Sequence, residues 1–125
     1  MELSIVVLVY NEVKTVKKAI DDVRSLQIEK EIIVIDNFST DGTTKVLESL
    51  NYDDIRIIFQ SKNFGVGKSY ETGFTMAKGK YIFIQHADLE YDYKVCIEML
   101  ELAERKKLDA VFGSRFKNYL IKGSE

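Results

Sequence analysis

Short apolar runs alternate with segments of helical periodicity along almost the whole chain, and this alternation restricts the possible folds more than any other feature. The runs have the continuous apolar character of strands covered on both faces, and they lie at residues 3–10, 31–36, 55–59, 80–85 and 109–113. The intervening segments carry apolar residues at helical spacing, and they lie at 13–26, 43–50, 66–77 and 92–107. The pattern predicts an α/β fold, a mostly parallel sheet with helices on both faces.

The composition is that of one globular domain, with 125 residues of which 46% are hydrophobic and 30% charged. The formal net charge is −2 and no block of Lys or Arg occurs, so we expect no nucleic-acid or anionic-membrane partner. The run from Ile5 to Tyr10 is too short to span a bilayer. Cys96 is the single cysteine, and its apolar setting predicts a buried thiol in a reducing compartment. We therefore expect a soluble cytoplasmic protein, with a domain at 1–117 and a short, polar, mobile tail at 118–125.

Polar residues gather directly after each predicted strand. Parallel sheets bind ligands in the crevice beyond the carboxyl ends of their strands, so these clusters are the candidate functional residues. They lie at 11–12, 36–43, 61–68, 86–90 and 114–115.

The cluster at 36–43 has a structural and a functional interpretation. Ser39, Asp41 and Thr43 could cap the following helix, beside a conformationally permissive Gly42. Asp36 differs, because a carboxylate at the buried end of an apolar strand needs a hydrogen-bond donor. A nucleobase N–H or a ribose hydroxyl would serve.

The segment at 62–69 matches two phosphate-binding motifs in part. A Walker A loop needs glycine where Lys62 stands. A dinucleotide-binding fingerprint needs a third glycine where Tyr70 stands, and it should follow the first strand. Neither motif is complete, so neither predicts a site by itself.

His86, Asp88 and Glu90 follow the most apolar strand at alternate positions. On an extended stretch all three side chains point to the same side. Hard oxygen ligands with open coordination positions suit Mg²⁺ or Mn²⁺ held together with a diphosphate. The alternative is that His86 is structural and that Asp88 only begins a turn.

Five motifs in order give the chain a family resemblance. They are Val-Leu-Val-Tyr-Asn-Glu at 7–12, Ile-Asp-Asn-Phe-Ser-Thr-Asp-Gly-Thr at 35–43, Asn-Phe-Gly at 63–65 with Gly73, His-Ala-Asp-Leu-Glu at 86–90 and Gly-Ser-Arg-Phe at 113–116. In this order the motifs resemble the family 2 glycosyltransferases of the GT-A fold, and most closely their dolichyl-phosphate mannosyltransferase-like branch. The resemblance implies a Rossmann-like core that binds a nucleotide-diphospho-sugar.

The resemblance also implies roles for individual residues. Asp36 would meet the base edge and Lys68 would lie near base or phosphate, while the nucleoside pocket would be lined by Tyr10, Asn11 and Glu12. Further donor contacts are implied for Asn37, Ser39, Asn63, Gly65 and Ala87.

The implied cofactor is Mn²⁺ or Mg²⁺, bound at the position of the family's Asp-x-Asp motif. His86 and Asp88 would hold the cation with assistance from Glu90. Asp88 and Arg115 would be the catalytic residues, Asp88 through the cation and Arg115 because it could reach the phosphates. No general base can be identified.

Three positions depart from the family pattern. Leu8 stands where proline is usual, and Asn37 and His86 each stand where aspartate is usual. Asn37 keeps an acceptor oxygen, so base binding could survive. Imidazole is a softer ligand than carboxylate, so His86 favours Mn²⁺ over Mg²⁺. Family domains also continue for roughly a further hundred residues that carry the acceptor site.

Three function classes follow from these observations. The first is a minimal glycosyltransferase that takes a UDP-sugar, with GDP-mannose as the alternative donor, and that acts alone, as a homodimer or with an acceptor-binding partner. The second is a nucleotide-sugar-binding module that hydrolyses its donor slowly at most. The third is a signalling receiver domain, which the residues at 11–12 and 114–115 argue against, since that class needs paired acids and a lysine there.

Overall fold

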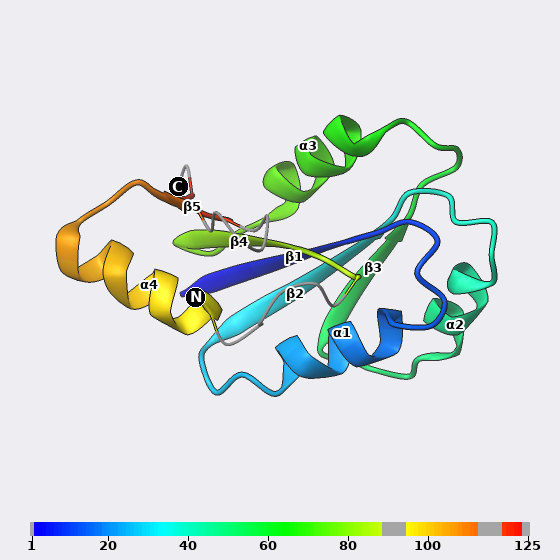
Figure 1. Ribbon diagram of the computed structural model, residues 1–125, viewed down its shortest axis with the longest axis horizontal. Helices are drawn as coiled ribbons and strands as arrows, with labels where there is room; N and C mark the ends of the chain where they lie inside the picture. Colours follow the sequence, from blue (N-terminus) through cyan, green and yellow to red (C-terminus); the bar gives the residue numbers. More distant parts are fainter. Residues whose placement is uncertain (1, 89–94, 113–118, 124–125) are drawn as a thin grey trace.

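The computed structural model describes residues 2–88, 95–112 and 119–123. In these ranges the chain forms a six-stranded sheet and four helices (Figure 1). In chain order they are β1 (Leu3–Val9), α1 (Val16–Arg24), β2 (Lys30–Asp36), α2 (Thr43–Ser49), β3 (Ile55–Phe59), α3 (Val66–Met76), β4 (Tyr81–His86), α4 (Val95–Lys106), β5 (Ala110–Phe112) and β6 (Tyr119–Lys122). No helix in the described ranges is both long and apolar enough to cross a membrane.

The sheet has the strand order β3-β2-β1-β4-β6-β5, and its first four strands are parallel. All seven residues of β1 are buried, because helices cover both faces of the sheet. Figure 1 shows α3 on one side and α1 on the other. The core on the α3 side includes Val6, Ile35 and Ile84, and the larger core contains residues of α1, α2 and α4. The predicted α/β architecture is confirmed.

The parallel register brings the carboxyl ends of β1, β2, β3 and β4 to one edge. Leu8 of β1 lies beside His86, and Val9 lies beside Asp36. Asp36 in turn lies beside Phe59 of β3. Residues that are far apart in sequence therefore meet beyond this edge.

The C-terminal segment differs from the prediction of a mobile polar tail. Residues Tyr119–Lys122 form β6, which pairs antiparallel with both β4 and β5. Leu120 is fully buried, and the Gly123 N–H donates to the Lys80 carbonyl at 2.7 Å. Three apolar residues in a row, at 119–121, are enough for a strand once two neighbours supply its hydrogen bonds. The tail prediction is wrong for these residues.

Cys96 lies in α4 and is fully buried, as the sequence predicts. Burial raises the pKa of its thiol to about 12. The thiol therefore stays protonated at neutral pH, which fits a packing role rather than a reactive one.

Gly73 of α3 lies against β1 so closely that a side chain would collide with the sheet. A Cβ at this position would be 2.6 Å from Val6 Cγ1. We expect Gly73→Ala to lower the free energy of unfolding by about 1–3 kcal/mol, measured by urea denaturation. Gly67→Ala on the same helix is the matched control, since its Cβ meets nothing within 4 Å; this change should stabilise by up to about 1 kcal/mol. Equal stability of Gly73→Ala and the parent chain would contradict this packing.

Candidate functional site

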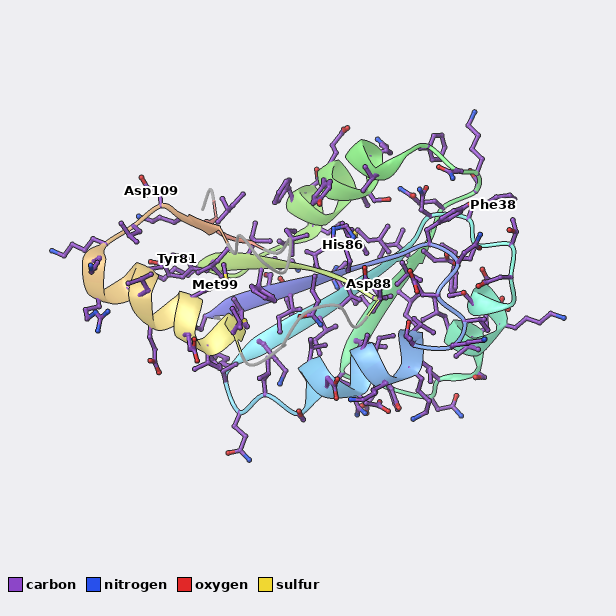
Figure 2. All side chains as sticks on the ribbon, in the orientation of Figure 1. Phe38, Tyr81, His86, Asp88, Met99 and Asp109 are labelled. Carbon is purple, nitrogen blue, oxygen red and sulfur yellow. The ribbon has the colours of Figure 1, made fainter. Side chains whose placement is uncertain are left out.

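A cavity of about 370 Å³ opens beyond the carboxyl ends of the parallel strands. Figure 2 shows His86 and Asp88 at the end of β4, where this cavity lies. It is lined by Leu8, Val9, Tyr10, Glu12, Asn37, Asn63, Gly65, Val66, Ser69, His86, Ala87 and Asp88. Eight of the predicted site residues are thus brought together from four separate stretches of sequence.

The loop between β1 and α1, which forms one wall of the cavity, is held by the segment after β2. The backbone N–H groups of residues 11–13 donate in turn to Ser39 Oγ, Thr43 Oγ1 and Asp41 Oδ2, at 2.9, 2.9 and 3.3 Å. The same three side chains that the sequence offered as helix caps therefore fix the neighbouring loop. Two of the predicted site positions, 11 and 39, act in this clamp and do not line the cavity.

The helix-capping alternative holds for Asp41 in a modified form. The N-cap residue of α2 is Gly42, at φ +102°, which has no side chain, and the preceding Asp41 accepts a hydrogen bond from the first N–H of the helix instead. Asp41 accepts hydrogen bonds from both the hydroxyl and the N–H of Thr43. The hydroxyl contact is the main reason that the pKa of Asp41 lies below its usual range. The carboxylate is therefore ionised at neutral pH and available to the loop.

Asp36 is 1% exposed, and the protein itself supplies its hydrogen-bond donors. Oδ1 accepts from the N–H and the hydroxyl of Ser39, at 3.1 and 2.6 Å, and Oδ2 accepts from the Thr44 hydroxyl. The buried carboxylate therefore does not need a hydrogen-bond donor from a ligand. Asp36 does not line the cavity, whereas the next residue, Asn37, does.

Asn37 joins the end of β2 to the glycine-containing loop before α3. Its Nδ2 donates to Asn63 Oδ1 at 3.0 Å, and its Oδ1 accepts from the Phe64 N–H at 3.2 Å. Asn63 Oδ1 also accepts from the N–H of Gly65, which stands at φ +88°. An ionised aspartate at position 37 could accept but not donate. The asparagine that departs from the family pattern thus uses both ends of its amide.

The structure places Ser69, and not the predicted Lys68, in the cavity wall. Lys68 lies on α3, forms an ion pair with Glu71 at 3.5 Å and does not line the cavity. Ser69 is 2% exposed, lines the cavity and donates to Gln60 at 3.2 Å. The sequence analysis did not identify Ser69 as a site residue, because helical periodicity does not show which polar residue of a helix faces a cavity.

The end of β4 is anchored to both β1 and α1. The Ala87 N–H donates to the Leu8 carbonyl at 3.1 Å, and the Thr15 hydroxyl donates to the Ala87 carbonyl at 2.6 Å. Ala87 is also buried, so the backbone between His86 and Asp88 is held in place. Both flanking side chains line the cavity.

Thr43 gives a direct test of the clamp around residues 11–13. Its fully buried hydroxyl accepts from the Glu12 N–H and donates to Asp41. We expect Thr43→Val to cost about 1–3 kcal/mol in urea denaturation, since two partners lose a hydrogen bond with little change in shape. Thr72→Val is the control, because that exposed hydroxyl bonds only within its own helix; it should change stability by less than about 0.5 kcal/mol. Similar effects for both variants would show that the clamp has no special energetic role.

Comparison with known families gives this site its context. Residues 4–123 match the family described as Glycosyl transferase family 2. The chain belongs to this family. The matched range contains every residue that lines the cavity, so the resemblance carried by the five sequence motifs is confirmed.

Relatives of this family 2 chain include two enzymes named for lipid phosphates. It is 30% identical over 124 residues to the dodecaprenyl-phosphate galacturonate synthase of Rhizobium johnstonii, covering 92% of this chain and 36% of that protein. It is 37% identical over 98 residues to the dolichyl-phosphate beta-glucosyltransferase of Saccharomyces cerevisiae, covering 69% and 29%. The chain thus spans about a third of the length of these relatives.

Solved structures confirm the Rossmann-like GT-A fold of the chain. The mannosyltransferase PcManGT from Pyrobaculum calidifontis, in complex with GDP-Man and Mn²⁺, superposes with a TM-score of 0.80 at 18% identity, covering 97% of this chain and 44% of that one. S. aureus TarS 1-349 in complex with UDP gives a TM-score of 0.74 at 20% identity, covering 90% and 35%. These matches do not support a homodimer.

The family's cation would find two of its three predicted ligands in the cavity. His86 and Asp88 line it, whereas Glu90 and Arg115 lie outside the described residues. In the described part of the chain, no group of three or more His, Cys, Asp or Glu side chains could enclose a metal ion. An open pair of ligands fits a cation whose other positions are filled by phosphate oxygens and water.

Proposed function

We propose that the cavity binds a nucleotide-diphospho-sugar together with a divalent cation, and that this binding serves sugar transfer to an acceptor. The observation that carries the proposal is the convergence of Tyr10, Glu12, Asn37, His86 and Asp88 on one cavity in a family 2 chain. Its volume of about 370 Å³ lies within the usual range for small-molecule sites. The complexes of PcManGT with GDP-Man and of TarS with UDP support a donor of this class.

Each polar group of the cavity suits a part of such a donor. Tyr10 is 45% exposed, and its aromatic ring is a group on which a base can stack. The Glu12 carboxylate can accept hydrogen bonds from ribose hydroxyls. Asn37 and Asn63 also line the cavity and are joined to each other by a hydrogen bond.

The cation end of the site would hold the diphosphate. His86 and Asp88 are the described residues that would bind the cation. Departure of the nucleotide builds negative charge on the diphosphate, and a bound dication stabilises that charge as a Lewis acid. Arg115, if it reaches the phosphates as the family resemblance implies, would add a second positive charge. The residues of the chain thus bind and orient the donor so that its leaving group departs readily.

A binding screen tests this function. We expect UDP and UDP-sugars to raise the melting temperature in the presence of Mn²⁺, more weakly with Mg²⁺ and not with EDTA, because ligands that bind only the native state stabilise it. Absence of any shift with every nucleoside diphosphate and cation would show that the cavity is not a donor site.

A second binding measurement decides which base the site prefers. We expect UDP to bind more tightly than GDP, because the sequence resemblance favours a UDP-sugar as donor. The check is a competition titration at fixed Mn²⁺. Displacement of UDP by a lower concentration of GDP would assign the site to a guanine nucleotide instead.

A further inference from the structure

Tyr70 does not line the cavity but contacts a residue that does. The hydroxyl of Tyr70, on α3, lies 3.1 Å from Nε2 of His86 at the end of β4. The two rings meet edge to face, with centroids 6.2 Å apart and an interplanar angle of 77°. His86 lines the cavity, so Tyr70 touches the site through it.

Tyr70 is itself held in place. Its ring stacks on Phe74 one turn further along α3, at 6.3 Å between centroids and 24° between planes. It also packs against the apolar cluster on this face of the sheet, which contains Leu8 and Ile84. The hydroxyl is therefore presented to His86 from a fixed ring.

This contact has a chemical consequence for the imidazole. A tyrosine hydroxyl can both donate and accept a hydrogen bond, so the contact is compatible with either tautomer of the free imidazole and fixes the orientation of the ring. A nitrogen that shares a hydrogen bond cannot also ligate a cation, so the contact argues against Nε2 as a ligand atom. Partners of this kind, which touch a ligating side chain but not the metal, commonly change metal affinity by about tenfold to a hundredfold when removed.

We propose that Tyr70 is a positioning residue, which holds the His86 imidazole in one orientation and leaves Nδ1 as its ligand atom for the cation of the donor complex. The proposal rests on the proposed function for its ligand, but not for the Tyr70–His86 contact itself. The contact occurs at position 86, where the family pattern usually has aspartate and this chain has histidine.

The single histidine of the chain makes the contact measurable without any ligand. We compare imidazole ¹⁵N spectra of the parent chain, Tyr70→Phe and Tyr52→Phe at about pH 8.5, where an ordinary histidine is neutral. Tyr52→Phe is the matched control, since it removes a tyrosine hydroxyl bonded to Asp21 at 2.6 Å and keeps the ring. We expect the same Nε2 chemical shift in the parent chain and in Tyr52→Phe, and a displaced Nε2 shift in Tyr70→Phe, because that nitrogen loses its hydrogen-bond partner. Identical spectra for all three proteins would overturn the proposal.

A second measurement connects the contact to the donor. Calorimetry of UDP with Mn²⁺ should show at least about a tenfold loss of affinity in Tyr70→Phe and less than a twofold change in Tyr52→Phe. Affinity within twofold of the parent chain in Tyr70→Phe, despite an altered imidazole spectrum, would refute the positioning role and leave the proposed function intact. Failure of the parent chain to bind UDP or GDP with Mn²⁺ would refute the ligand part of both proposals, while the spectra would still decide whether Tyr70 positions His86.

Discussion

Asp88→Ala is expected to abolish cation-dependent binding of UDP, with a loss of affinity of at least about a hundredfold by calorimetry. Asp88 contributes the carboxylate among the two predicted cation ligands that line the cavity. Removal of its charge leaves an imidazole to hold a hard dication beside a diphosphate, and imidazole alone is a poor ligand for that task. The melting temperature without ligand should change little, because Asp88 is partly exposed at the end of its strand.

The control for Asp88 is Asp53→Ala. Asp53 is an exposed aspartate in the connection between α2 and β3, at the opposite edge of the sheet. Its replacement makes the same change in net charge without touching the cavity, so UDP affinity should stay within about twofold. Unchanged affinity in Asp88→Ala would place the cation elsewhere and remove the main support for the proposed site.

The order of strands and helices could be predicted from periodicity because each element buries a stripe or a face of its own. The sequence could not predict β6, because four residues become a strand only through pairing with β4 and β5. β4 is distant from β6 in the sequence, and β6 runs antiparallel to both of its partners. No local pattern of residues 119–122 specifies this pairing. Strand pairing between distant segments is the part of a fold that propensity describes least well.

The location of the site followed from one topological rule, since side chains after parallel strands meet at one edge. The partners of individual side chains did not follow from it. Asp36 is satisfied by Ser39 and Thr44 only because the chain turns back after β2, with Phe38 at φ +62°. A positive φ at phenylalanine is rare, and nothing in the sequence announces it. Hydrogen-bond partners in loops depend on such turns.

The phase of α3 explains two further errors. Neighbouring residues of a helix differ by about 100° in direction, so Ser69 lines the cavity while Lys68 faces Glu71. Periodicity gives the apolar stripe of a helix but not which adjacent polar residue touches a site. In the sequence, Tyr70 occupies the place where a glycine-rich motif needs glycine, and nothing there indicates its contact with His86.

Sugar transfer by the 125-residue chain is expected to be weak or absent even where donor binding is intact. Catalysis needs interactions that strengthen in the transition state, and a positioned general base typically contributes about a hundredfold to ten-thousandfold. The described carboxylates of the cavity are Glu12 and Asp88, and we have proposed both as donor-binding groups. The chain also spans only about a third of the length of its relatives, so the acceptor contacts of those proteins need not be present.

Slow release of nucleoside diphosphate from a UDP-sugar is then the expected residual activity, because the cation site can still ease departure of the leaving group while water attacks the sugar. The measurement is nucleoside diphosphate release with and without a panel of acceptors, including lipid phosphates. The same assay on Asp88→Ala controls for contaminating hydrolases, since hydrolysis at this site should disappear in that variant. Acceptor-stimulated turnover at an ordinary enzymatic rate of about 10 per second would show that the chain carries a general base and an acceptor site, and would contradict this prediction.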